Sequence, residues 1–242
     1  MKWSPVIELR QYTHFPGMRD VLIDLFEESF VESQEAHGMK VIGTFRDLVD
    51  PTRFVWIRGF PSADRRASCL NAFYGGPVWK RHREAANATL VDSDNVLLLR
   101  PAKAGGGFAL PVARPPLAAR RGSDRGVIEA AILSLRDAPD DQLVARLRSE
   151  AADVSAGGTP IACFVTSETP NDFPVLPVRE GEHVLVQFTG FPSRADYDPA
   201  ERATAAVLLR RLAWAPLVAT PQVLALEPTR RSLLAPAACP HA

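Results

Sequence analysis

The sequence predicts an α+β fold in which two βαββαβ units place their four-stranded antiparallel sheets face to face. Three observations lead to this prediction. The 242 residues are 46% apolar, which suits one large domain or two small ones. A stretch rich in Gly, Pro and Arg divides the chain at 103–126. The parts on either side of it carry matching motifs in the same order, which is typical of one unit used twice.

The internal repeat is most specific at a strand-to-helix junction, where four residues, GFPS, are identical. FVWIRGFPSAD (54–64) corresponds there to LVQFTGFPSRAD (185–196). The outer strands also correspond: VIELRQY (6–12) with VIEAAIL (127–133), and VLLLRPA (96–102) with VLALEPT (223–229). We therefore expect a first unit at 1–102, a linker at 103–126, a second, degenerate unit at 127–235 and a tail at 236–242.

Each element of the first unit has its own signal. The alternation at 6–12 predicts a strand. An apolar stripe over 18–37 predicts a helix that stops at Gly38. The remaining elements are a hairpin (39–47 and 53–60), a helix capped by Ser62 that breaks at 75–77 and restarts to about Ala88, and a closing strand (96–100). The second unit repeats this order, with a longer surface loop at 166–182.

Each βαββαβ unit has helices on one face of its sheet and leaves the other face bare. An exposed apolar face costs about 25 cal/mol per Å². The bare faces of the two units can cover each other, either within one chain or between chains. We expect a homo-oligomer in either case.

Composition narrows the class of partner. Lys and Arg balance Asp and Glu at 28 each, which argues against a dedicated nucleic-acid binder. No apolar run approaches the roughly 18 residues of a membrane span. The three cysteines are an odd number without metal-binding spacing, so we expect free thiols and a cytoplasmic protein. The basic linker residues are expected to keep the linker solvated, with an RNA or lipid contact as the alternative: Lys103, Arg114, Arg120, Arg121 and Arg125.

Two strands of the first unit carry polar and aromatic side chains on one face each. These are Glu8, Arg10 and Tyr12 on the first strand, and Phe54, Trp56 and Arg58 on the third. We expect the opposite, apolar faces to contact the helices, which directs the polar set toward the interior or mouth of a barrel. A mostly apolar cavity with a few convergent polar groups is typical of a small-molecule site.

The second unit has lost most of this set. Its corresponding residues are Glu129, Ala131, Leu133, Gln187 and Thr189. We therefore expect any active pocket to belong to the first unit and the second unit to act mainly as a scaffold. The alternative is structural: Glu8 and Arg10 would pair with Arg58 and Glu129 and join the sheets. A filled barrel with Glu8, Arg10 and Arg58 mutually paired would favour that alternative.

Histidines and tryptophans add further candidates. His14 follows the first strand and is a candidate general base, with an exposed loop residue as the alternative. His82 lies one turn after Trp79, within reach of a pocket mouth or on a solvated helix face. Trp79 and Trp214 occupy equivalent places, which favours core packing over ligand stacking. No H-E-x-x-H or similar spacing is present, so we expect no metal and no cofactor.

The first unit resembles the NIPSNAP family through ELRQYTHFPGMRD (8–20), HGMKVIGTF (37–45), VWIRGF (55–60) and Pro77-Val78-Trp79, and LEPTRRSLL (226–234) resembles the end of such a domain. The resemblance covers 6–102 well and the second half weakly. It implies ferredoxin-like units of the dimeric α/β-barrel superfamily, with a pocket between sheet and helices. That superfamily includes cofactor-free quinol-type monooxygenases, isomerases, cyclases, haem-degrading enzymes and proteins without known activity.

Together these observations predict a protein that binds a small, largely apolar or planar molecule in a first-unit pocket. In the enzymatic hypothesis it is a cofactor-free monooxygenase or an isomerase/cyclase. Tyr12 or His14 would move a proton, and Arg10 or Arg58 would stabilise an enolate or phenolate. The substrate would contact Glu8, Phe54, Trp56, Trp79 and His82. The alternative is a binding or assembly module without activity.

Overall fold

A computed structural model describes residues 2–118, 124–154, 157–197 and 204–236. The first unit consists of β2 (Val6–His14), α1 (Arg19–Leu25), the π-helical turn η1 (Phe26–Phe30), α2 (Val31–Ala36), β3 (Lys40–Asp47), β4 (Arg53–Phe60), α3 (Arg66–Tyr74), α4 (Pro77–Asn87) and β5 (Leu90–Pro101). The second unit consists of β7 (Val127–Leu135), α5 (Asp141–Val154), β8 (Thr159–Thr166), β9 (His183–Phe191), α6 (Thr204–Arg211) and β10 (Gln222–Pro228). Between the units, β6 (Phe108–Ala109) pairs with β1 (Lys2–Trp3).

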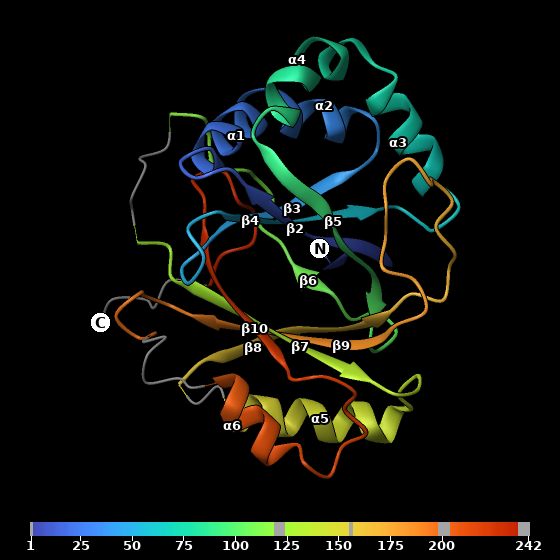
Figure 1. Cartoon of the computed structure of the whole chain (residues 1–242), viewed down its shortest axis with the longest axis vertical. Helices are drawn as coiled ribbons and strands as arrows, with labels where there is room; N and C mark the ends of the chain where they lie inside the picture. Colours follow the sequence, from blue (N-terminus) through green and yellow to red (C-terminus); the bar gives the residue numbers. More distant parts are fainter. Residues whose placement is uncertain (1, 119–123, 155–156, 198–203, 237–242) are drawn as a thin grey trace.

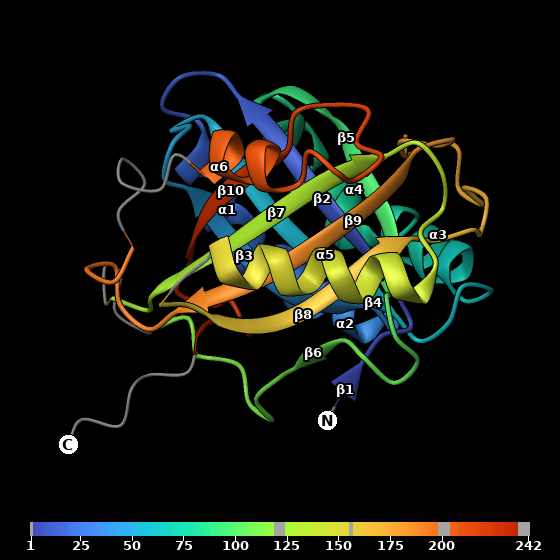
Figure 2. The same ribbon diagram turned by 90° about the horizontal axis from the view of Figure 1, so that it is seen from below.

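The strands of the two units form one closed antiparallel barrel, in the order β10-β3-β4-β2-β5-β8-β9-β7. Helices α1 to α4 cover the sheet of the first unit at the top of Figure 1, and α5 and α6 cover the sheet of the second unit below it. Figure 2 shows α5 and α6 lying across the lower strands. The predicted fold, two tandem units packed face to face, is confirmed. Because the barrel closes within one chain, no second copy is needed to cover the bare faces.

Apolar side chains from both sheets fill the barrel interior. The cluster includes Ile7, Leu9, Val55, Ile57, Leu97 and Leu99 from the first unit, and Ile128, Ala130, Ile132, Val186, Phe188 and Leu224 from the second. Phe108 of β6 is fully buried in the same cluster. It packs against Phe164 and Phe188, with ring centroids 4.9 and 5.1 Å away.

The structure corrects the expected orientation of the strand faces. The apolar faces of β2 and β4 point into the barrel, and the polar and aromatic faces point toward the helices. The barrel interior is closed to water, so a charged group there would need partners that a purely apolar cluster does not supply. The helix side supplies them: Gln34 on α2, Arg66 and Tyr74 on α3 all hydrogen-bond to charged residues of these strands.

Two of the predicted helices are interrupted. The helix expected over 18–37 is interrupted by η1, which widens its middle turn. The break expected at 75–77 is present, because α3 ends at Tyr74 and Pro77 occupies the first turn of α4.

The linker is more tightly held than the sequence analysis predicted. Arg114 donates hydrogen bonds to the Glu35 carboxylate and to the carbonyl of Val41, both at 2.6 Å. Arg125 donates to the carbonyls of Thr229 and Ser232, at 2.6 and 2.9 Å. The expectation that these arginines only keep the linker solvated is therefore wrong. Arg120 and Arg121 lie outside the described residues.

Neither a membrane-spanning helix nor a cluster of metal-binding side chains occurs among the described residues. Each helix in these residues is too short or too polar to span a lipid bilayer. No group of three or more His, Cys, Asp or Glu side chains in the same residues is arranged to hold a metal ion.

Candidate functional site

A cavity of about 400 Å³ lies between the sheet and the helices of the first unit. Tyr12 on β2 and Trp56 on β4 contribute from the sheet, and the helices contribute a largely aromatic wall. The full lining is Tyr12, Leu22, Phe26, Phe30, Gln34, Trp56, Phe73, Tyr74, Trp79, Ala86, Asn87, Leu90, Ser93, Val175 and Leu176. The cavity is therefore apolar over most of its surface, with few polar groups, as small-molecule sites usually are.

The π-helical turn η1 shapes this wall. Phe26 and Phe30 lie at its two ends and both line the cavity. Phe26 packs on Trp56 with ring centroids 4.8 Å apart, and Phe30 packs on Trp79 at 5.6 Å. Single π-helical turns within α-helices occur frequently at functional sites.

The segment that follows β10 holds the π-helical turn from outside. The buried carboxylate of Glu27 accepts hydrogen bonds from the Thr229 hydroxyl and from Nε of Arg230, both at 2.6 Å. It also accepts one from the backbone N–H of Arg231, and the Arg231 side chain donates to the Glu27 carbonyl at 2.7 Å. The end of the second unit thus stabilises a wall of the first-unit cavity.

A buried ionic cluster lies on the same sheet face, beside the cavity. Arg10 donates to Oε2 of Glu8 at 2.7 Å, and Nε of Arg58 donates to the same oxygen at 2.8 Å. The other oxygen, Oε1, accepts from Nε of Arg66 at 2.8 Å. Side-chain exposure in this group is at most 1%. A second carboxylate, Asp172, contacts Arg66 at 2.5 Å. Three guanidinium groups against two carboxylates leave a net positive charge near the cavity.

These charges set the protonation of Glu8. Burial alone would raise the pKa of its carboxyl, because a charged group loses its hydration. The guanidinium groups of Arg58, Arg10 and Arg66 outweigh burial and hold the pKa well below its usual range. Glu8 is therefore ionised at any ordinary pH.

Tyr12 stays protonated for the opposite reason. Burial raises the pKa of its phenol, and the nearby Arg10 offsets this only in part. The Tyr12 oxygen accepts a hydrogen bond from Nε of Arg10 at 2.9 Å, which orients the phenol. The phenolic proton is then available to a group in the cavity.

Trp56, whose side chain lines the cavity, carries a further hydrogen-bond donor. Its side chain is buried, and among the described residues its Nε1 has no hydrogen-bond partner. An unsatisfied buried donor costs about 1–3 kcal/mol, so such a group in a native protein calls for an explanation. A ligand oxygen bound in the cavity would satisfy it.

The structure brings together some of the predicted site residues. Tyr12, Trp56 and Trp79 line the cavity. Trp79 packs against other aromatic rings, as expected from its position equivalent to that of Trp214, and it also lines the cavity. Glu8, Arg10 and Arg58 lie in the ionic cluster, where they are mutually paired. The structural alternative named Glu129 as a further partner, but Glu129 is on the helix-facing side of β7, on the far side of the barrel.

The other three predicted residues do not line the cavity. Phe54 packs against Phe26 at 5.6 Å, and His82 packs against Phe30 at 6.2 Å. His14 is 1% exposed, so the alternative interpretation of an exposed loop histidine is wrong. Its Nδ1 is 3.3 Å from the carbonyl oxygen of Thr89, and burial lowers the pKa of its imidazole.

Sequence reasoning missed several cavity residues. The stripe that contains Phe26 and Phe30 was visible, but it indicates only that these residues are buried. Gln34 and Tyr74 lie on helices whose patterns predict nothing about ligands, and the same is true of Arg66 in the ionic cluster. Val175 and Leu176 belong to the loop at 166–182, and no local signal places this loop over the other unit.

The comparisons with known proteins agree with this architecture. No curated protein sequence matches the chain. In structure the chain is similar to a protein from Lactobacillus acidophilus that is provisionally described as a monooxygenase (TM-score 0.50, 13% identity, 96% of this chain and 99% of the other covered). It is also similar to a protein from Fusobacterium nucleatum with the same provisional description (0.53, 8%, 95% and 94%). A third similar structure is a dye-decolorizing peroxidase from Bacteroides thetaiotaomicron (0.52, 8%, 95% and 94%).

At these identities the structural similarity establishes the fold alone, and one fold hosts different chemistries. The family comes from the sequence: a model of the NIPSNAP family matches residues 7–104. The first unit of this chain is therefore similar to the NIPSNAP family, and the resemblance expected from its motifs is confirmed.

Proposed function

We propose that the first unit binds a planar, largely apolar molecule that carries a hydrogen-bond-accepting oxygen. The buried N–H of Trp56, which has no partner among the described residues, is the observation that carries this proposal. The ligand oxygen would accept from Trp56 Nε1 and from the Tyr12 phenol. Aromatic rings from η1, α3 and α4 would pack on the faces of the ligand.

The charge next to the cavity favours an oxygen that carries or develops negative charge. Arg10 and Arg58 both lie against the Trp56 ring, with Cζ 5.5 and 5.1 Å from the ring centroid. In a site with little water, their positive charge is only weakly screened. A phenolate or enolate would therefore be stabilised relative to its neutral form.

A cofactor-free monooxygenase or an isomerase/cyclase would use this stabilisation. Its shared first step is loss of a proton from the substrate to give an enolate or phenolate. Among the described lining residues none is a carboxylate or an imidazole. In this hypothesis the proton therefore passes to a water molecule or hydroxide ion that enters the cavity with the substrate, while Tyr12 and Trp56 hold the substrate oxygen.

The mutual pairing of Glu8, Arg10 and Arg58 favours the alternative, a binding module without activity. In that case the ionic cluster only stabilises the fold, and the cavity serves to hold a ligand. Both hypotheses require the same ligand class, so binding is tested first and proton transfer second.

The binding experiment compares 9-fluorenone with fluorene, which has the same ring skeleton without the carbonyl. We expect fluorenone to bind about tenfold more tightly, the difference that one hydrogen bond of about 1.4 kcal/mol makes. Dissociation constants are measured by titration calorimetry. Trp56→Phe is expected to bring the two constants together, whereas Trp214→Phe, in the second unit, should leave the ratio unchanged. Equal affinity of the native protein for both compounds would overturn the proposal.

Proton transfer is followed by NMR as exchange of the α-hydrogens of 2-tetralone in heavy water. Enzymatic activity predicts faster exchange with the native protein and a loss of the acceleration in Tyr12→Phe. Exchange at the buffer rate, together with carbonyl-dependent binding of fluorenone, would assign the protein to the non-catalytic alternative.

A further inference from the structure

The loop between β8 and β9 reaches from the second unit to the cavity of the first. We refer to residues 167–182 as the lid segment. In Figure 1 it rises from the lower sheet and passes beside α3. Its middle part supplies Val175 and Leu176 to the lining of the first-unit cavity. The second unit therefore contributes directly to the site and is more than the scaffold that the sequence analysis expected.

An ion pair fastens the middle of the lid segment to α3. Nη1 of Arg66 donates to Oδ1 of Asp172 at 2.5 Å and to Oδ1 of Asn171 at 3.0 Å. Oδ2 of Asp172 accepts from the backbone N–H of Ala67 at 3.1 Å, in the first turn of α3. A carboxylate near a helix N-terminus is favourably placed, because the helix dipole is positive there.

Aromatic stacking supports the same contact. Phe173 is buried and stacks on Tyr74, with ring centroids 6.0 Å apart and planes inclined by 23°. Tyr74 in turn lines the cavity. Val175, also at the cavity, is 80% exposed. An exposed valine at the edge of an apolar cavity would gain contacts when a ligand fills it.

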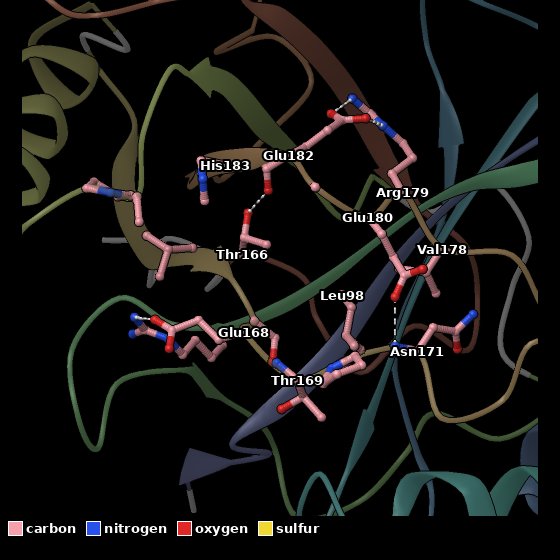
Figure 3. A pocket seen from close by; sticks show the side chains of 17 residues that line it. Leu98, Thr166, Glu168, Thr169, Asn171, Val178, Arg179, Glu180, Glu182 and His183 are labelled. Atoms are coloured by element: carbon pink, nitrogen blue, oxygen red, sulfur yellow. Dashed lines mark hydrogen bonds and ion pairs between the residues drawn. The ribbon is translucent and has the colours of Figure 1, made fainter.

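The two ends of the lid segment surround a second hollow of about 400 Å³, shown in Figure 3. The polar groups drawn there mostly bond to one another: Arg179 to Glu182, and Glu180 to the backbone N–H of Asn171. At the root of the segment, the N–H of Arg179 donates to the carbonyl of Val96 at 2.9 Å. The space between the ends is not filled by side chains, so the ends of the segment meet no close-packed neighbours there. The contacts that hold its middle are those of Asp172 with α3 and of Phe173 with the hydrophobic cluster of the first unit.

We infer that the lid segment is a latched lid of the first-unit cavity, with Asp172 as the latch and Leu176 as a residue that limits ligand size. Ligand entry and release require the Asp172–Arg66 contact to open. The ligand in this inference is the planar, oxygen-bearing molecule of the proposed function, on which the inference rests.

The latch also connects the lid to the ionic cluster. Arg66 bonds to Glu8 through Nε and to Asp172 through Nη1. When the latch opens, Arg66 keeps only the carboxylate of Glu8, so the positive charge beside the cavity increases. An incoming anionic oxygen is therefore attracted most strongly while the lid is open.

The test uses Asp172→Asn, which keeps the size of the side chain but removes its charge. We expect 9-fluorenone to dissociate about tenfold faster from this variant in stopped-flow experiments, as expected for the loss of a charge-assisted hydrogen bond. Glu168→Gln is the matched control, because Glu168 belongs to the same segment but is 82% exposed and pairs with Arg100. It should release the probe at the native rate.

Leu176→Ala tests the size limit. Its shorter side chain should improve the binding of benzanthrone, a larger planar ketone, relative to 9-fluorenone. An unchanged ratio of the two dissociation constants would show that Leu176 does not limit ligand size.

Hydrogen exchange gives a readout that needs no ligand. The backbone N–H of Ala67 is bonded to Asp172, so we expect it to exchange about tenfold faster in Asp172→Asn than in the native protein. If the native protein fails to bind fluorenone but this amide is deprotected, the proposed function fails and the latch stands. If exchange and probe release are both unchanged in Asp172→Asn, the latch is overturned.

Discussion

The helix-facing sides of the two sheets occupy equivalent positions but carry different kinds of side chain. In the first unit Glu8 pairs across the strands with Arg58, and Arg10 with Trp56. At the corresponding places of the second unit, Glu129 lies opposite Thr189, and Ala131 opposite Gln187. The strand register thus supports the correspondence that the sequence repeat predicted.

The consequence of this difference lies in what packs under the helices. In the second unit a cluster of mainly aliphatic residues fills the space between the sheet and α5 and α6: it includes Leu133, Val144, Leu147, Val165, Leu185, Leu208 and Leu212. In the first unit large aromatic rings and an ionic cluster occupy the equivalent layer and leave a cavity. Flexible aliphatic side chains pack densely, whereas rigid rings held by buried charges preserve a space of fixed shape.

We expect the largest loss of stability when a charge is introduced into the second unit. Ala131→Arg places a guanidinium at the position equivalent to Arg10, within the aliphatic cluster. We expect a loss of about 3–5 kcal/mol in the free energy of unfolding, because a buried charge without a partner is strongly destabilising. Urea denaturation measures this loss. Ala131→Met, of similar length but uncharged, should cost clearly less; an equal cost would mean that size rather than charge separates the two units.

The second test removes the negative centre of the first unit. Glu8→Gln leaves Arg10, Arg58 and Arg66 around a neutral amide. We expect a loss of about 3–5 kcal/mol, the usual result of breaking a buried ion pair from one side. The control is Asp20→Asn, because Asp20 is half exposed and pairs with Arg46 at the surface, where such pairs contribute about 0–1 kcal/mol. Similar melting temperatures for the two variants would contradict a structural role for the buried cluster.

The smallest effect concerns pH. The pKa of Glu8 is lowered in the folded protein from an ordinary value of 4.5. Below about pH 4.5 the unfolded chain therefore takes up a proton that the folded chain does not, and stability falls as the pH falls. One such group contributes about 1.4 kcal/mol per pH unit in this range.

The free energy of unfolding measured at pH 7, 4.5 and 3.5 should therefore converge for the native protein and Glu8→Gln as the solution becomes more acid. Other carboxylates also titrate in this range, and the difference between the two proteins isolates Glu8. A difference that stays constant down to pH 3.5 would show that Glu8 titrates in the folded state as it does in the unfolded chain.

Part of the site could be predicted because it follows from local sequence. The alternation on β2 and β4 places Glu8, Arg10 and Tyr12 on one face and Trp56 and Arg58 on another, and the structure joins these faces side by side. Local alternation does not indicate which side of the sheet each face occupies. The prediction assigned the charges to the barrel interior, and the partners on α2 and α3 instead hold them on the helix side.

The other contacts that the sequence did not predict join residues that are distant in the sequence. Val175 and Leu176 reach the cavity, and Asp172 reaches α3, only because β5 pairs with β8 and the barrel closes within the chain. Glu27 is buried in η1 because residues 229–231 supply its hydrogen bonds. No pattern within η1 or the lid segment encodes these contacts.

The amino-acid sequence alone was sufficient to predict the repeat, the order of strands and helices along the chain, and the concentration of polar and aromatic residues in one unit. These properties follow from residue periodicity and turn chemistry, which act over a few neighbouring residues. The tertiary structure decided that the barrel closes within one chain, that the charged faces turn toward the helices, and that a loop of the second unit covers the cavity of the first. Each of these depends on partners that are distant in the sequence, because burial of a charge or an apolar face is decided by what packs against it.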